Sequence, residues 1–141
     1  HTLALAKDGR VFAWGGDECG QSSVPWLLGG VVAIAAGTQH SLALDDRGRV
    51  HAWGAGAKGE GRPPHCGQSA LPSGLSGVTA IAAGAFHSLA LADGKVVAWG
   101  DRRAVQTAVP FFAGAVLAVA GGGSHSLALI AATEETAAQP R

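Results

Sequence analysis

The 141-residue sequence has no methionine and no tyrosine, only two cysteines, and few charged side chains, which make up 14% of the residues. Lysine plus arginine and aspartate plus glutamate number 10 each, so the formal net charge at pH 7 is zero. A neutral chain has no electrostatic footprint for nucleic acid or an anionic membrane surface. No apolar run in the sequence approaches the ~20 residues of a membrane span. We therefore expect neither nucleic acid nor membrane as a partner.

Glycine is abundant instead, and one pattern recurs along the chain. The sequence has 22 glycines and is 48% hydrophobic, which suits short strands and tight turns better than a disordered chain. A histidine followed by alternating large and small side chains begins each copy, at His1, His40, His87 and His125. These histidines stand about 40 residues apart, a period that marks stacked supersecondary units.

Each unit predicts a β-hairpin. Large side chains alternate with small ones in residues 41–44, and Val97 and Trp99 share one face of residues 96–99, which is strand spacing. Asp93-Gly94 predicts a tight two-residue turn, because glycine tolerates a positive φ. The first two copies have one more residue at this place, so we expect a longer, bulged turn in both.

A third apolar run follows in each unit, at residues 31–37, 78–84 and 115–121. Before it comes a short segment that ends in proline, which we place at a sheet edge or a strand start because proline cannot donate to a ladder. Three or four short strands in about forty residues fit one blade of a β-propeller. A helical solenoid is disfavoured, since no window keeps the apolar spacing of a helix.

The combination His-Ser-Leu-Ala-Leu, Asp-Gly, Ala-Trp-Gly, Gly-Gln, Val-Pro and Ile-Ala-Ala-Gly resembles the repeat of the regulator of chromosome condensation family, which also occurs in tubulin-suppressor-like proteins. The resemblance implies an all-β fold of β-propeller blades, usually in a ring of about seven. It covers three full repeats, a stub and then a polar tail: 1–39, 40–86, 87–124, 125–129 and 130–141. We therefore expect an incomplete ring and a segment of a longer product. Self-association of two copies to complete the ring is the alternative.

The recurring polar and aromatic residues are interpreted as parts of the fold. We expect each repeated histidine to make the same hydrogen bond within its own blade rather than to join a metal ring, because equivalent blade positions are spread around an axis. Trp14, Trp53 and Trp99 lie in the repeated Ala-Trp-Gly motif, which indicates blade packing, with photoreception as the alternative.

The two cysteines hold the same position in successive units. Equivalent points on adjacent blades lie too far apart for a disulfide, which needs Cα atoms within about 7 Å. Cys19 and Cys66 are therefore predicted to be free thiols. Free thiols are consistent with a reducing compartment, which favours the cytoplasm or the nucleus.

Residues outside the repeated pattern are the candidates for partner binding. Residues 54–59 match a dinucleotide fingerprint formally, but the Glu-Gly-Arg-Pro-Pro that follows cannot open the helix that the motif requires, so no cofactor is expected. We interpret this insertion as a loop that displays side chains at a blade rim, where insertions in repeat proteins collect, with an idle loop as the alternative. The candidate residues are Lys58, Glu60, Arg62, His65, Arg102, Arg103 and Trp26.

No nucleophile, base and orienting acid occur together in a way that the repeat does not already explain. The sequence therefore predicts a non-catalytic protein–protein interaction scaffold that binds a partner through its rim loops. The resemblance implies a second function, guanine-nucleotide exchange on a small GTPase. No catalytic, metal-binding or cofactor-binding residue is predicted.

Overall fold

The computed structural model describes residues 1–57 and 62–132, and this part of the chain is all β, with no helix. None of it therefore offers a helix long and apolar enough to cross a membrane. Its strands are β1 (Thr2–Leu5), β2 (Val11–Trp14), β3 (Val31–Ala36), β4 (His40–Asp45), β5 (Val50–Gly54), β6 (Val78–Ala83), β7 (His87–Ala92), β8 (Lys95–Gly100), β9 (Val116–Gly121) and β10 (Ser126–Ile130).

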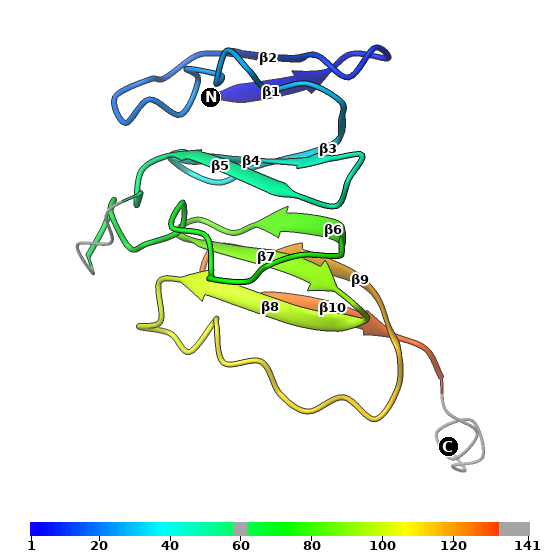
Figure 1. Ribbon diagram of the computed structural model, residues 1–141. Coiled ribbons are helices and arrows are strands. Elements are labelled where there is room, and N and C mark those ends of the chain that lie inside the picture. Colours follow the sequence, from blue (N-terminus) through cyan, green and yellow to red (C-terminus); the bar gives the residue numbers. More distant parts are fainter. Residues whose placement is uncertain (58–61, 133–141) are drawn as a thin grey trace.

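The strands form four small antiparallel sheets, as expected for propeller blades. The sheets are β1-β2, β3-β4-β5, β6-β7-β8 and β9-β10, and we call them the first, second, third and last sheet. They lie face to face in chain order, from the blue N-terminal hairpin to the orange strands near the C-terminus (Figure 1). The second and third sheets each have a neighbour on both faces, whereas the first and last sheets have one.

Each three-stranded sheet combines residues of two sequence units. β3 belongs to the unit that begins at His1, but it pairs with β4 of the next unit, and β6 pairs with β7 in the same way. The proline-containing segments lie in loops instead of forming edge strands, because the residues around them make local turns such as the hydrogen bond from Val24 N to Ser22 O. The chain thus crosses to the next sheet before each hairpin, which ties neighbouring sheets together covalently.

The hairpin turns have the two forms that the sequence predicts. Asp93 and Gly94 both have positive φ, 49° and 75°, in the two-residue turn between β7 and β8. Gly9 and Gly48 have φ of 81° and 74° in the longer turns. Gly9 N donates to Ala6 O at 3.0 Å there, so a tight turn ends in a left-handed glycine, the geometry of a bulged hairpin.

The apolar core lies between the sheets. Leu42 and Leu44 of β4 pack against Ala90 and Trp99 of the third sheet, and Leu42 is fully buried. A second cluster between the first and second sheets contains Trp53. Burying one leucine side chain contributes about 1.5–3 kcal/mol, so these contacts between sheets stabilise the fold.

Candidate functional site

The repeated polar side chains meet between neighbouring sheets at one main-chain carbonyl. At the junction of the first and second sheets, the hydroxyl of Ser41 donates to Gln21 O at 2.8 Å. The indole N–H of Trp53 donates to the same oxygen at 2.9 Å. Gln21 comes from the loop after β2, so the second sheet is held to the loop of the sheet before it.

The same arrangement recurs one unit later. Ser88 and Trp99 of the third sheet both donate to Gln68 O, at 2.9 Å and 2.8 Å. In the last sheet, Ser126 donates to Gln106 O at 2.8 Å. No tryptophan completes that third junction within the described residues, because the last sheet has no third strand there.

The histidine bonds run between sheets, so the prediction that each stays within its own blade is wrong. The ring Nε2 atoms lie near the serine hydroxyls of the next sheet, in the pairs His1–Ser41 (2.9 Å), His40–Ser88 (3.0 Å) and His87–Ser126 (3.0 Å). The physical reason is the alternation of a strand: consecutive residues point to opposite faces, so a histidine cannot meet the serine that follows it.

These hydrogen bonds and the burial of the rings determine the tautomer and the charge of the imidazoles. Each serine hydroxyl has one proton, which it donates to the glutamine carbonyl, so it accepts from the histidine Nε2–H. Burial, and to a smaller extent the nearby His87, lower the pKa of His40 to about 4. Burial also lowers the pKa of His87. Both rings are therefore neutral at pH 7, and they serve as links between sheets.

The glycine of the repeated Ala-Ala-Gly motif makes room for the ring. A Cβ at Gly37 would collide with the imidazole of His40, and one at Gly84 would collide with that of His87. The main chain closes the same corner, since Gly84 N donates to His87 O at 2.9 Å. The glycine, the histidine and the serine of the motif thus act together at the junctions that His40 and His87 form.

The glutamine side chain and the cysteine lie in the same loop. Gln21 Oε1 accepts from Cys19 N at 2.8 Å, and Gln68 Oε1 accepts from Cys66 N at 2.8 Å. Neither cysteine forms a disulfide, which confirms the prediction of two free thiols. Cys66 is buried, and burial raises the pKa of its thiol, with a further increase from the charge of Asp101.

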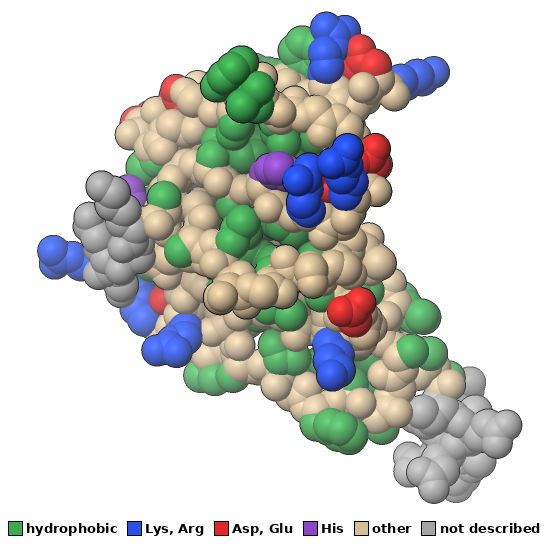
Figure 2. Space-filling view, in the orientation of Figure 1, with side chains coloured by type: hydrophobic (Ala, Val, Ile, Leu, Met, Phe, Trp, Pro, Cys, Tyr) green, Lys and Arg blue, Asp and Glu red, His purple; other side chains and the backbone are tan. Residues whose placement is uncertain are grey.

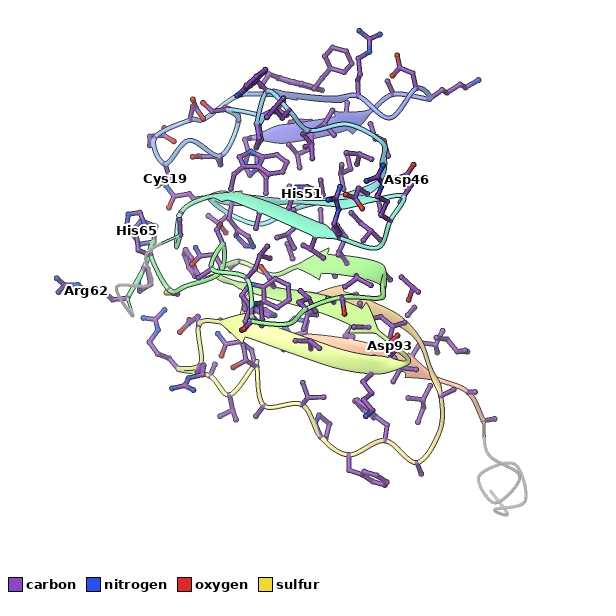
Figure 3. The ribbon with its side chains drawn as sticks, in the orientation of Figure 1. Cys19, Asp46, His51, Arg62, His65 and Asp93 are labelled. Atoms are coloured by element: carbon purple, nitrogen blue, oxygen red, sulfur yellow. The ribbon has the colours of Figure 1, made fainter. Side chains whose placement is uncertain are left out.

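The two described rim residues of the inserted loop lie on one side of the molecule. Arg62 and His65 are found on the side where Cys19 lies, and Asp46 and Asp93 mark the opposite side (Figure 3). Arg62 is exposed, and its carbonyl accepts from His65 N at 2.8 Å. Lys58 and Glu60 lie outside the described residues.

The other predicted rim residues differ in whether they interact with the rest of the chain. The guanidinium of Arg103 binds Asp101 through Nε at 2.8 Å and Nη2 at 2.9 Å, and these hydrogen bonds lower the pKa of Asp101 to about 2. Arg102 is exposed. Trp26, in the loop between β2 and β3, is 89% exposed, so it does not fill the blade.

A carboxylate that the sequence analysis missed holds the opposite end of the second sheet. Asp45 accepts from the side chains of Arg49 and His51, at 2.9 Å and 3.0 Å, and from two backbone amides of its turn. Burial alone would raise the pKa of Asp45, but these hydrogen bonds outweigh burial and hold it well below its usual range. The sequence did contain a signal for this carboxylate. The third hairpin has the neutral Ala92 at the position of Asp45, so the charge is a departure from the repeat.

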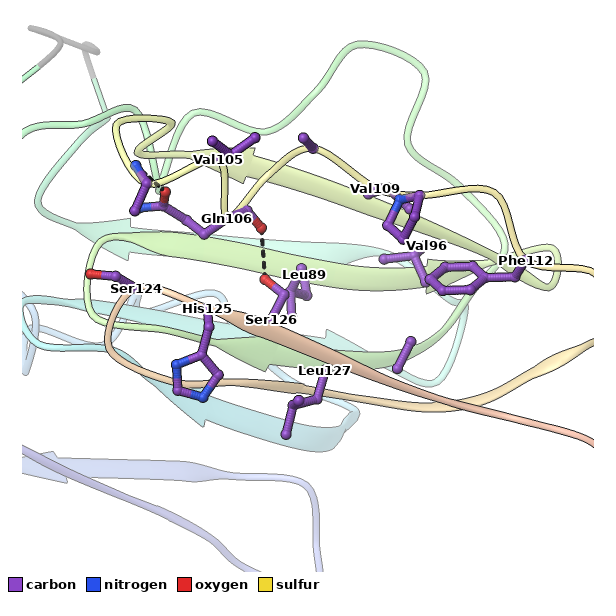
Figure 4. Close-up of a pocket in the computed structure, with 14 residues that line it drawn as sticks. Leu89, Val96, Val105, Gln106, Val109, Phe112, Ser124, His125, Ser126 and Leu127 are labelled. Carbon is purple, nitrogen blue, oxygen red and sulfur yellow. Dashed lines mark hydrogen bonds between the residues drawn. The ribbon is translucent and has the colours of Figure 1, made fainter. Parts of the chain in front are cut away.

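A cleft beside the last sheet distinguishes that junction from the others. It has a volume of about 330 Å³ and opens next to Gln106 and Ser126, whose hydrogen bond is drawn in Figure 4. Leu89 and Val96 of the third sheet form part of its apolar wall. Leu89 corresponds to Leu42, which packs near Trp99 at the junction between the second and third sheets. The cleft therefore lies where the equivalent tryptophan would pack.

Within residues 1–57 and 62–132, no three histidine, cysteine, aspartate or glutamate side chains are arranged to hold a metal ion. The functional features that the described residues offer are therefore the exposed rim loops, the cleft and the open faces of the first and last sheets. The rim loops carry side chains outside the repeated hydrogen-bond system, whereas the cleft borders that system at Gln106 and Ser126.

Comparison with known structures shows the same architecture in larger proteins. Human WBSCR16 has 23% identity and a TM-score of 0.70, over 92% of this chain and 42% of that one. Prp20p from Saccharomyces cerevisiae has 23% identity and a TM-score of 0.72, over 91% and 40%. The ectodomain of the receptor kinase CR4 from Physcomitrella patens has 19% identity and a TM-score of 0.68, over 91% and 35%. The chain thus spans less than half the length of these proteins.

Sequence comparison identifies the repeat itself. A comparison with curated protein sequences finds no match. The family model of the regulator of chromosome condensation (RCC1) repeat, however, matches residues 1–21, 31–60 and 78–101, which is more than half of the chain. The chain therefore belongs to the regulator of chromosome condensation repeat family, and its sheets are blades of a β-propeller.

Proposed function

We propose that this chain is a non-catalytic protein-interaction module that holds a partner protein through its rim loops. One observation carries the proposal: the repeated histidines, serines and glutamine carbonyls bind one another between the sheets. The fold thus uses the polar groups that recur, whereas the loops that differ between units carry exposed side chains. Such variable loops on a rigid scaffold are where binding residues collect.

The loop residues that we propose for partner binding are an aromatic side chain and cations. Trp26 is almost fully exposed, and Arg62 and Arg102 are exposed without an ion pair in the described part of the chain. Tryptophan and arginine are the residue types that dominate binding energy in protein interfaces. Arg103 adds less charge because Asp101 neutralises it. We therefore expect a partner with an acidic surface and an apolar pocket.

Basic side chains also lie at the opposite edge of the molecule, which gives the experiment a matched control (Figure 2). The 141-residue chain is immobilised, bound proteins are identified by mass spectrometry, and the leading partner is purified and titrated. Trp26→Ala and the double variant Arg62→Glu/Arg102→Glu should each weaken its binding about tenfold or more. The control variant Arg47→Glu, at the opposite edge, should bind like the wild type.

Equal binding by all variants would show that the rim loops are not the interaction surface. Circular dichroism on each variant is needed first, so that a loss of binding is not a loss of folding. A partner whose binding responds to Arg47→Glu but not to the rim variants would place the interface at the opposite edge and contradict the proposal.

Guanine-nucleotide exchange on a small GTPase is the second candidate. Its support is the structural similarity to Prp20p, whose structure was described together with its binding to Gsp1p and histones. Release of a fluorescent guanine nucleotide from a panel of small GTPases, with and without the chain, tests it directly. Accelerated release would favour exchange over a purely scaffolding role.

A further inference from the structure

The rim loop between β8 and β9 contains a residue in an unfavourable backbone conformation. Val105 has a φ of 61°, in the left-handed region that favours glycine. A β-branched side chain is rare in this region, because its Cβ lies too close to the following carbonyl oxygen. Val105 is also 68% exposed, so burial of its side chain offsets little of this strain. Packing within the chain therefore does not explain why valine stands here.

The equivalent residues of the other two loops are glycines. The residue directly before the repeated glutamine is Gly20 in the first loop and Gly67 in the second, with φ of 76° and 84°. In all three loops the glutamine Oε1 accepts from the backbone N–H two residues before it, at 2.8, 2.8 and 2.9 Å. Val105 lies next to its glutamine, Gln106, which is buried and whose carbonyl binds Ser126 (Figure 4). The loop thus holds Val105 in a conformation for which its relatives use glycine.

The exposure of this position is a property of the loop. A Cβ at Gly20 would have no atom within 4 Å, although the second sheet, which packs beside that loop, has all three of its strands. The position therefore faces solvent even at a complete junction. Glycine would be the more stable residue in place of Val105, and strain of this kind is typical of functional sites.

The third loop also differs from the first in charge. Asp17 and Glu18 of the first loop are replaced by Arg102 and Arg103 at the same positions of the third. Val105 N donates to Arg102 O at 3.1 Å, so the valine and this arginine belong to one turn. Arg102 is exposed, whereas Arg103 is already in an ion pair. The turn thus presents an apolar side chain and a cation together.

We propose that Val105 is a partner-binding residue, which the third rim loop presents to an apolar pocket on a partner protein, with carboxylates at the border of the pocket for Arg102. The inference rests on the function proposed above and adds a contact that is not among the residues predicted from the sequence. A protein surface is the occupant that fits, because an apolar pocket with an acidic border complements both side chains. A strained valine in place of glycine is then a loss of stability retained for binding.

Three variants separate strain from contact, with melting temperature and affinity as the two measurements. Affinity is measured by calorimetric titration of the purified partner from the binding experiment above. Val105→Gly should raise the melting temperature by about 2 °C or more, because it relieves the strain, and should weaken binding about fivefold or more.

Val105→Thr keeps the branched shape and therefore the strain, so its melting temperature should equal that of the wild type. Its hydroxyl enters an apolar pocket and should weaken binding to a similar extent. Gly20→Val is the matched control: it introduces the strain into the first loop, so it should lower the melting temperature and bind like the wild type.

The outcomes distinguish this inference from the function on which it rests. A Val105→Gly variant that is no more stable than the wild type would show that the valine is not strained, and one that binds like the wild type would show that it is not a contact. Either result overturns the inference. If Trp26→Ala weakens binding and Val105→Gly does not, the rim loops remain the interaction surface and only the inference fails. If no rim variant weakens binding, both fail.

Discussion

The inner sheets and the end sheets carry the same side chains in different surroundings. Leu42 of the second sheet is fully buried, whereas Leu127, at the same position of the last sheet, is 61% exposed. Trp99 is buried and donates to Gln68 O, whereas Trp14 is 55% exposed. Burial is thus supplied by the neighbouring sheet and not by the motif. Stability in this stack should therefore depend on position along the chain, as in other repeat proteins.

The largest expected contrast is between equivalent leucines. Leu42→Ala should lower the free energy of unfolding by about 2–5 kcal/mol, because it leaves a cavity between two sheets. Leu127→Ala removes a side chain that is mostly in water already, so its effect should be below about 1 kcal/mol. Urea denaturation of both variants at the same low protein concentration measures the difference, and equal losses would refute the comparison.

The second contrast concerns pH. Burial holds the folded-state pKa of His40 at about 4, below its ordinary value of 6.5. The unfolded chain therefore takes up a proton before the folded chain does, and stability that is present above pH 6.5 is lost as the pH falls toward 4, by about 3 kcal/mol. Burial of His87 acts in the same direction.

Urea denaturation at several pH values between 7 and 4 measures this loss. His40→Gln removes the titrating group, so its free energy of unfolding should fall less steeply over the same range. The contribution of Asp101 is lost mainly between its ordinary pKa of 3.8 and its folded-state pKa of about 2, which lies below the histidine window. A variant that shows the full wild-type slope would contradict the assignment of a buried neutral imidazole.

The third contrast compares two glycines. Gly84→Ala should cost about 1–3 kcal/mol, because its Cβ would meet the ring of His87 and a main-chain carbonyl. Gly123→Ala should be nearly neutral, since nothing lies within 4 Å of a Cβ at that position. Thermal unfolding of the two variants checks the difference, and a destabilised Gly123→Ala with a stable Gly84→Ala would be the opposite result.

The sequence was sufficient for features that depend on local geometry. The period of the motif predicted the blades, the glycines at residues 9, 48 and 94 predicted the two turn forms, and the aligned cysteines predicted free thiols. These follow from φ preferences and from the alternation of a strand, which act over a few residues.

Features that depend on which sheet lies next to which were not predictable in the same way. The histidines recur with the period of the serines, so the sequence could not show that His40 reaches Ser88 and not a group in its own blade. The cleft beside Gln106 depends on what the last sheet has as a neighbour. Asp45 is a different case, because its partners Arg49 and His51 lie in the same hairpin, and the sequence already showed a charge at a position that is neutral in the third hairpin.

The most direct test of the account is a double-mutant cycle across the second and third sheets. His40→Ala and Ser88→Ala, alone and together, should show a coupling free energy of about 1 kcal/mol, because the two side chains share one hydrogen bond. A parallel cycle for His40 and Ser41 should show coupling close to zero, since these neighbours point to opposite faces of β4. Coupling of His40 to Ser41 and not to Ser88 would contradict the claim that the repeated histidine joins one sheet to the next.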